Sequence, residues 1–491
     1  MNWKATIGAL VVLLGVGAYY LLVAEPEHME KVAKEAKKTV LTTFDDKDIQ
    51  KIEVKKGQDA KPVTAERRGE KKWVITSPVQ TRGDRYAWDG IARKMAKLKA
   101  KRFIKDSAGD LKPFGLDKPR VVVTATTKAG KVVSLLLGED NKFDNTVFAK
   151  TADATRIVSV DKDVFSSADK DLLGLRDKKL LDFEQKDVQR FTVKVVHEQE
   201  KKGEEQSKKK TKKTRKAKKE SQEKSIETTV EYTLNRKGDD WELEKPIKGP
   251  ADKSTASSIL SSISNIRAES FVKEKVKDLA DAGIESPGLQ VTIELKGKKE
   301  PLKVWVEKPK PGEEASKQEL LATAGPGNPL AKIKGYIYKN VDKGLFQLRD
   351  KSLVKFDRKD VKKIVVRDKD VSYTLEAAGE PINWKITAPT TAPAKKYKVS
   401  SLLSSLSYLK AKEFAEESAS DLSKYGLDKP DREITLFDKA GKELARLLIG
   451  KADGDVYYAK GAAQKRVSKL DKKAVDRWAW KMDDVQDKNK K

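Results

Sequence analysis

The sequence contains no cysteine and only two histidines, His28 and His197, in 491 residues. The missing cysteine excludes disulfides, thiolate metal sites and a cysteine nucleophile, and it leaves the redox compartment open. With so little histidine, imidazole metal sites and histidine general bases are nearly excluded as well. Charge, in contrast, is abundant, since charged residues make up 37% of the chain and the net charge is +28. This balance predicts a charge-rich protein with an anionic partner.

Long apolar runs are also scarce, and the clearest is the uncharged stretch 5–24 near the N-terminus. Twenty helical residues at about 1.5 Å each span roughly the 30 Å of a bilayer's hydrocarbon layer. Lys4 precedes the stretch and Glu25 follows it, which predicts a cytoplasmic N-terminus with the rest of the chain outside. A cleaved signal peptide is the alternative, with residues 16–18 as a small-residue cleavage site. We expect a retained anchor, because the apolar run continues past that site.

A ten-residue signature at 110–119 returns at 278–287 and at 421–430. A tryptophan stands 46 positions before the last proline of every copy, at Trp73, Trp241 and Trp384. Such fixed spacing predicts a three-copy array, and the chain length also favours about three domains. We interpret the three tryptophans as core packing rather than as platforms for sugar stacking.

Most residue types in the signature have a backbone role. Its first aspartate suits a helix N-cap, its glycine a left-handed turn position, and its proline the launch of a strand. These residues are Asp110, Asp278 and Asp421; Gly115, Gly283 and Gly426; and Pro119, Pro287 and Pro430. The acidic residues just before the proline, Asp117, Glu285 and Asp428, have no evident backbone role and remain weak functional candidates.

The hydrophobic periodicity predicts the same elements in every copy. In the first copy, alternation indicates strands at 49–54, 63–66, 73–76, 121–125, 132–137, 146–150 and 156–160, and a short helix at 163–168. A stripe at i, i+4, i+7 predicts an amphipathic helix before the signature. The stripe residues are Ile91, Met95 and Leu98; Ile259, Ile263 and Ile266; and Leu402, Leu406 and Leu409, followed by Phe103, Phe271 and Phe414, which we also assign to the core.

The predicted fold class is therefore α+β: an N-terminal transmembrane helix followed by three tandem repeats, each an antiparallel sheet of six or seven strands with a packed helix. The predicted divisions are a cytoplasmic stub and anchor at 1–24, a linker at 25–43, repeats at 44–182, 183–355 and 356–480, and a polar tail at 481–491. Repeat 2 carries a basic insert at 200–225, expected to be disordered, and a loop at 308–332. The linker beginning at Leu175 returns at Leu348.

No stretch predicts catalysis, a cofactor site or a metal site. Residues 249–255 lack the glycine that a phosphate loop needs before its lysine. Paired carboxylates such as Asp239 and Asp240 are expected on solvated turns, and the serine runs at 257–264 and 400–407 have no histidine beside them. We therefore expect a protein that is not an enzyme.

The basic insert is the feature with the clearest physical partner. Residues 201–224 hold twelve Lys or Arg and four Glu, hence 12 − 4 = +8. Without interleaved aromatic residues it is poorly suited to nucleic acid. Outside a membrane it would attract anionic lipid or an envelope polymer, or serve as a solvated spacer without a partner.

The tryptophan–proline interval, the repeated turn (an aromatic residue or Ala, then Gly, Leu or Ile, an acidic residue, any residue and Pro) and the N-terminal stretch resemble a bacterial family, domain of unknown function 4340, over most of 44–480. Repeat 2 departs from the pattern at Ala282 and Glu285. The resemblance implies an envelope protein of the bacterial inner membrane with its bulk in the periplasm. It also implies an accessory role beside gliding-motility-type ABC transporter subunits, and it supplies no catalytic residues.

From the residues and the resemblance we expect a non-enzymatic periplasmic scaffold or accessory subunit of an ABC-type transport system, with permease or ATPase subunits as partners. The alternative is a cell-envelope protein that binds polysaccharide or peptidoglycan independently of a transporter.

Overall fold

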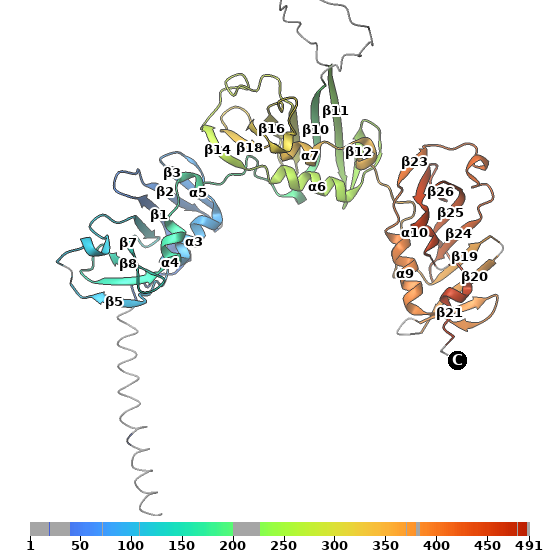
Figure 1. Cartoon of the computed structure of the whole chain (residues 1–491), viewed down its shortest axis with the longest axis horizontal. Helices are drawn as coiled ribbons and strands as arrows, with labels where there is room; N and C mark the ends of the chain where they lie inside the picture. The colour runs from blue at the N-terminus through green and yellow to red at the C-terminus, as the bar shows by residue number, and fades with distance from the viewer. Residues whose placement is uncertain are drawn as a thin grey trace, which may run out of the picture. The chain divides into compact units, whose positions relative to one another are not determined.

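The computed structural model describes residues 19, 40–70, 72–107, 109–199, 226–369, 371–379, 383–478 and 480–488 (Figure 1). The predicted basic insert and all of the predicted anchor except Tyr19 lie outside these residues. In the described part of the chain, no helix is long and apolar enough to cross a membrane. The chain divides into two compact units, 1–180 with 267–274, and 181–266 with 275–491.

The described strands form three nine-stranded antiparallel sheets with one shared strand order, β4-β3-β2-β1-β6-β7-β8-β9-β5 in the first. We refer to each sheet and its helices as a module. Module 1 has β1 (Ile49–Lys56), β2 (Val63–Arg68), β3 (Lys72–Ser77), β4 (Thr81–Arg82), β5 (Arg102–Lys105), β6 (Val121–Thr127), β7 (Val132–Asn141), β8 (Thr146–Thr151) and β9 (Ile157–Asp161). Module 2 has β10 (Val188–Gln199), β11 (Ile226–Lys237), β12 (Asp240–Lys245), β13 (Gly249–Pro250), β14 (Ala268–Lys273), β15 (Leu289–Leu295), β16 (Leu302–Val306), β17 (Glu319–Thr323) and β18 (Leu330–Lys334). Module 3 has β19 (Lys363–Asp368), β20 (Val371–Ala378), β21 (Asn383–Ala388), β22 (Ala392–Pro393), β23 (Glu413–Glu416), β24 (Arg432–Phe437), β25 (Glu443–Asp453), β26 (Val456–Gly461) and β27 (Val467–Asp471).

The predicted α+β repeats are confirmed, but the strand count of six or seven was wrong. The two missed strands lie at the edges of each sheet, and in module 1 they are β4 and β5. A two-residue strand is too short to show a period-2 pattern, and β5 buries none of its four side chains fully. Edge strands of this kind leave no alternating hydrophobic signal in the sequence.

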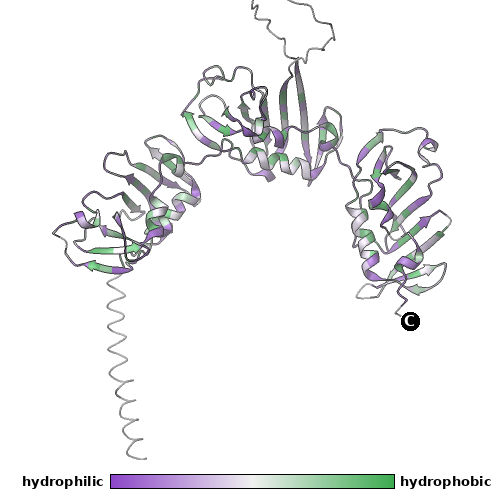
Figure 2. Cartoon of the chain, viewed as in Figure 1, coloured by the Kyte–Doolittle hydropathy of each residue, from purple (hydrophilic) through white to green (hydrophobic). Residues whose placement is uncertain are grey.

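The inner strands follow the expected alternation. In β6 the side chains of Val121, Val123 and Ala125 are buried, while those between them are half-buried. The colouring by hydropathy shows the same alternation along the strands of all three sheets (Figure 2). Because successive side chains point to opposite faces, one face of the sheet supplies the core.

Each module has a main helix, a second short helix after its last long strand, and a four-residue helix at its end. These are α3 (Arg85–Met95), α4 (Lys162–Ala168) and α5 (Leu172–Leu175); α6 (Lys253–Ser264), α7 (Tyr336–Val341) and α8 (Leu345–Leu348); and α9 (Lys396–Ser407), α10 (Lys472–Asp476) and α11 (Met482–Val485). In module 1 the main helix buries Ile91 and Met95 in one cluster with Ile52 and Ile75 of the sheet. The third stripe residue, Leu98, is buried beyond the end of the helix.

The segment 308–332, predicted as a loop, contains the short helix η5 (Ala315–Lys317) and most of the β17/β18 hairpin. Leu320 and Ala322 alternate inward from β17 and are buried. The loop prediction was therefore wrong for residues 319–323 and for the start of β18. The alternation in β17 is short, and the Pro and Gly residues around it favoured a loop in the sequence.

Candidate binding groove and module junctions

The three repeated tryptophans serve packing. Trp73, Trp241 and Trp384 are buried on β3, β12 and β21. The guanidinium groups of Arg67 and Arg236 lie 4.6 and 4.4 Å from the ring centres of Trp73 and Trp241. Buried and covered in this way, the indoles have no free face for a sugar, which confirms the packing interpretation.

The repeated signature forms a tight turn against the sheet. Gly115, Gly283 and Gly426 have φ values of 63, 67 and 65°, the left-handed region predicted for them,. The aspartate acts differently from the prediction of an N-cap. In module 1 the Asp110 carboxylate accepts a hydrogen bond of 3.0 Å from the Lys112 amide, and the residue preceding the short helix η3 (Lys112–Phe114) is Leu111.

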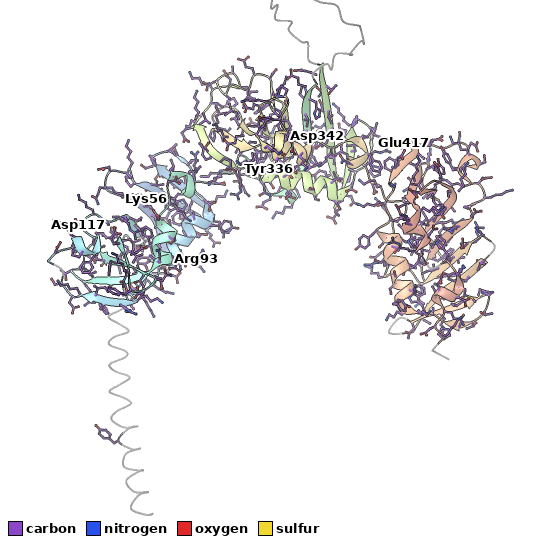
Figure 3. All side chains as sticks on the ribbon, in the orientation of Figure 1. Lys56, Arg93, Asp117, Tyr336, Asp342 and Glu417 are labelled. Atoms are coloured by element: carbon purple, nitrogen blue, oxygen red, sulfur yellow. The ribbon has the colours of Figure 1, made fainter. Side chains whose placement is uncertain are left out.

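The acidic functional candidates of the signature are solvent-exposed side chains. Asp117, Glu285 and Asp428 are exposed, and within the described residues they make no hydrogen bond or ion pair. Asp117 is labelled on module 1 in Figure 3.

The serine runs 257–264 and 400–407 lie on the main helices α6 and α9. On α6, the hydroxyls of Ser262 and Ser264 donate to the carbonyl oxygens of Ser258 and Ser261. His197 Nε2 lies 3.4 Å from a carboxylate oxygen of Asp342, which is labelled in Figure 3. Over the described residues, no group of three or more His, Asp or Glu is placed to hold a metal ion.

The first linker carries an arginine, Arg176, that binds the edge strand β14 and the residue just past it. Arg176 comes directly after α5, and its side chain is only 3% exposed. Its guanidinium carbon lies 3.4 Å from the ring centre of Phe271. Two of its nitrogens donate to the two carboxylate oxygens of Glu274 at 2.9 and 3.1 Å. Stacking and a two-pronged ion pair are the interactions for which a guanidinium is best suited.

The second linker repeats the arrangement. Arg349 follows α8, lies 4.6 Å from the ring centre of Phe414, and pairs with both carboxylate oxygens of Glu417 (Figure 3). Arg466 of module 3 covers the same ring at 3.9 Å. The linkers thus repeat in their contacts as well as in their sequence.

At the two ends of the array, the positions equivalent to this ring, carboxylate and linker arginine make different contacts. In module 1, Phe103 is 38% exposed and Asp106 pairs at 3.5 Å with Arg156 of the same module. The assignment of Phe103 to the core was therefore wrong, because it lies on the edge strand β5. The residue after α11, Gln486, forms a single β-bridge with Ala394. This bridge is equivalent to the one between Arg176 and Gly83 in module 1. The last module therefore carries glutamine in place of the linker arginine.

A buried carboxylate lies close to the second linker. Asp252 is 5% exposed and caps α6 by accepting a hydrogen bond of 2.8 Å from the Thr255 amide. The ammonium groups of Lys351 and Lys410 lie 3.3 and 2.9 Å from its Oδ2. Burial alone would raise the pKa of Asp252, but the bonds from Lys410 and Thr255 and the charge of Lys351 outweigh it and lower the pKa to about 2,.

A groove of about 610 Å³ runs beside α9 and α10 in module 3. Two aromatic residues line it: Tyr408, which is 73% exposed, and the half-buried Trp478, whose ring centre lies 5.7 Å from that of Trp480. The full lining is Lys398, Ser401, Leu402, Ser405, Tyr408, Leu409, Lys410, Ala474, Arg477 and Trp478. We call this the α9/α10 groove.

Sequence reasoning missed this groove. The aligned modules contain a signal for it, because Trp478 occupies the position of Ala168 and Val341, both of which are buried. Tyr408 likewise stands where module 1 has Lys97 and module 2 has Asn265. The equivalent α3/α4 groove of module 1 holds about 450 Å³ and is lined by lysines together with Asp161 and Asp163.

Identical strand orders, equivalent turns and equivalent linkers define a tandem repeat protein of three α+β modules. The family model described as a domain of unknown function (DUF4340) matches residues 73–236, 241–383 and 384–490, and the chain belongs to this family. The three matches begin at Trp73, Trp241 and Trp384, whereas each sheet also contains the two strands before the strand that carries its tryptophan. No curated protein and no solved structure matches the chain.

Proposed function

We propose that this protein is a non-enzymatic scaffold of the bacterial envelope that serves as the periplasmic accessory subunit of an ABC-type, gliding-motility-like transport system. In this proposal residues 5–24 anchor the chain in the inner membrane, with the N-terminus in the cytoplasm and the modules in the periplasm. The transport role comes from the resemblance to the family.

The observation that supports a scaffold is the repeated linker junction. Arg176 and Arg349 make the same pair of contacts, a stacked ring on an edge strand (β14 or β23) and a two-pronged carboxylate just past that strand. A chain that repeats its connections as well as its modules offers a partner the same surfaces several times over, as other repeat proteins do.

Crosslinking in native membranes followed by affinity purification of the full chain tests this role. We expect permease and ATPase subunits of one transporter to be recovered with the chain. The matched control is residues 1–43 fused to an unrelated soluble protein, which keeps the predicted anchor and lacks the modules. Equal recovery of the transporter with this control, or its absence from both samples, would contradict the proposal.

The alternative function, binding of an envelope polysaccharide or peptidoglycan without a transporter, is favoured by the α9/α10 groove. Its exposed aromatic side chain and its hydroxyl and cationic side chains are groups that can contact a sugar polymer,. Retention of the full chain on isolated envelope glycan, with no transporter subunit in the crosslinked sample, would support this alternative instead.

A further inference from the structure

The aromatic residues of the α9/α10 groove are not required by the fold. The positions equivalent to Trp478 hold Ala168 and Val341, which are buried among the helices and strands of their own modules. The same topology therefore forms with a small or an aliphatic side chain at this position. Trp478 instead remains partly exposed and lines, together with Tyr408, a groove that is large enough for a small ligand. Ligand sites of proteins commonly have volumes of about 300–1,000 Å³.

The cations of this groove are available to a ligand. Arg477 is exposed and forms no hydrogen bond or ion pair with the described residues. Lys398 is half-buried on the first turn of α9, and its ammonium group lies 6.0 Å from the ring centre of Tyr397. Lys410, in contrast, is already paired with Asp252. No carboxylate lines the groove, so the charges of Arg477 and Lys398 are not neutralised there by the described residues.

Hydroxyl groups complete the lining. Ser401 is exposed and Ser405 is half-buried on the face of α9 that borders the groove. Neither hydroxyl makes a hydrogen bond within the described part of the chain, whereas Ser407 outside the groove donates to the Ser404 carbonyl. A hydroxyl can donate and accept, which suits the alternating hydroxyl groups of a carbohydrate.

We propose that the α9/α10 groove binds an acidic carbohydrate, with a sugar ring against Trp478 and Tyr408 and its carboxylates on Arg477 and Lys398. An aromatic ring offers an apolar face to the C–H groups of a sugar, and a guanidinium pairs with a carboxylate through two parallel hydrogen bonds. None of the described residues that line the groove lies in a strand, so the lining offers no strand edge of the kind that an extended acidic peptide pairs with. The inference deepens the alternative function above and is independent of the transport role.

Binding of polygalacturonate to the purified full chain tests the site, with neutral dextran and polyglutamate as comparison polymers. We expect polygalacturonate to bind at low salt, dextran not to bind, and polyglutamate to bind at least about tenfold more weakly, a difference of about 1.4 kcal/mol. Polyglutamate binding equal to that of polygalacturonate would overturn the carbohydrate assignment, and equal binding of dextran would overturn the role of charge.

Two variants locate the site without disturbing the core. Tyr408→Ala removes a ring that is 73% exposed, and Arg477→Glu reverses an exposed charge. Each is expected to weaken polygalacturonate binding about tenfold. Arg93→Glu is the matched control, because Arg93 lines the equivalent groove of module 1 (Figure 3), and it should leave binding within about twofold. An equal loss in Arg477→Glu and Arg93→Glu would show that only total charge matters, and unchanged binding in Tyr408→Ala would remove the role of the ring; either result would overturn the proposal. Since transporter recovery after crosslinking is measured separately, failure of either idea leaves the other unaffected.

Discussion

At the scale of single residues, Gly138 and Gly450 mark where the signature turn touches the sheet. A Cβ atom added at Gly138 would lie 2.1 Å from the carbonyl oxygen of Phe114, and one added at Gly450 would lie 2.1 Å from that of Tyr425. Both nearest atoms are backbone carbonyl oxygens, so they cannot move away by a change of side-chain rotamer. These glycines were not singled out from the sequence, because the reason for them lies in a segment about 24 residues away along the chain.

We therefore predict that Gly138→Ala destabilises module 1 by about 2 kcal/mol, because the turn must move off the sheet. Gly90→Ala is the matched control. Gly90 lies within α3 with open space around the added Cβ, so alanine there should stabilise by about 0.5–1 kcal/mol. Urea unfolding of the full chain, with hydrogen exchange at β7 as the local readout, measures both. Equal effects of the two substitutions would contradict the steric argument.

Asp252 predicts a dependence of stability on pH. Its pKa in the folded chain is about 2, against 3.8 for the free side chain. A lowered pKa stabilises the fold above the unfolded value, so this contribution is present above about pH 4 and is lost as the pH falls towards 2. The shift corresponds to about 2 kcal/mol.

Asp252→Asn separates the charge from the helix cap, since asparagine also caps helices well. We expect the variant to be less stable at pH 7 and to lose less stability than the wild type between pH 4 and pH 2. Urea midpoints measured at pH 7, 4, 3 and 2 give the comparison. Two parallel curves would show that the Asp252 carboxylate does not titrate in this window.

At the scale of elements, the linker arginines Arg176 and Arg349 stand at equivalent sequence positions and make equivalent contacts. Replacing Arg349 by Ala leaves Glu417 without its partner and uncovers one side of Phe414. Because Glu417 is largely exposed, the cost is expected to be about 1–2 kcal/mol rather than that of a fully buried pair. We expect limited proteolysis within 349–356 to become about tenfold faster. Gln486→Ala, at the equivalent position after α11, is expected to leave cleavage there unchanged.

The elements that the sequence predicted are those with a local pattern. The strands around Trp73, the helix stripe from Ile91 and the left-handed Gly115 all follow from periodicity or from backbone preference. The edge strands β4 and β5 did not. β4 has only two residues, and β5 is defined by its pairing with β9, more than 50 residues later in the chain. Phe103 was assigned to the core because all three modules have a phenylalanine at this position. The sequence alone does not show whether such a ring packs in the core or stacks against an arginine, as Phe103 does with Arg156.

The candidate groove was harder to predict than the fold. Trp478 and Tyr408 are about 70 residues apart in the sequence, and only the folded module brings them to the lining of one groove. Aligning the modules would have shown Trp478 in place of Ala168 and Val341. That difference alone does not say whether the extra ring points inward or outward, which the structure decides.

At the scale of the whole molecule, charge is the dominant property. The net charge is +28, and residues 201–224 contribute +8 of it, which leaves +20 for the rest of the chain. Both parts would attract an anionic surface, so the net charge alone does not identify the segment responsible. A basic segment gains about 1 kcal/mol for each Lys or Arg brought close to anionic lipid, and salt screens this attraction over about 10 Å at 0.1 M.

Deleting residues 201–224 from the full chain should weaken sedimentation with phosphatidylserine-containing liposomes at low salt about tenfold or more. Adding 0.5 M salt should abolish the difference, because the attraction is electrostatic. The matched control replaces the twelve basic residues of this segment by glutamine, which keeps its length and removes its positive charge. If the segment acts through its charge, the control will behave like the deletion. Binding that is unchanged in both variants would assign the attraction to the modules, and a loss in the deletion alone would assign it to the segment's length rather than to its charge.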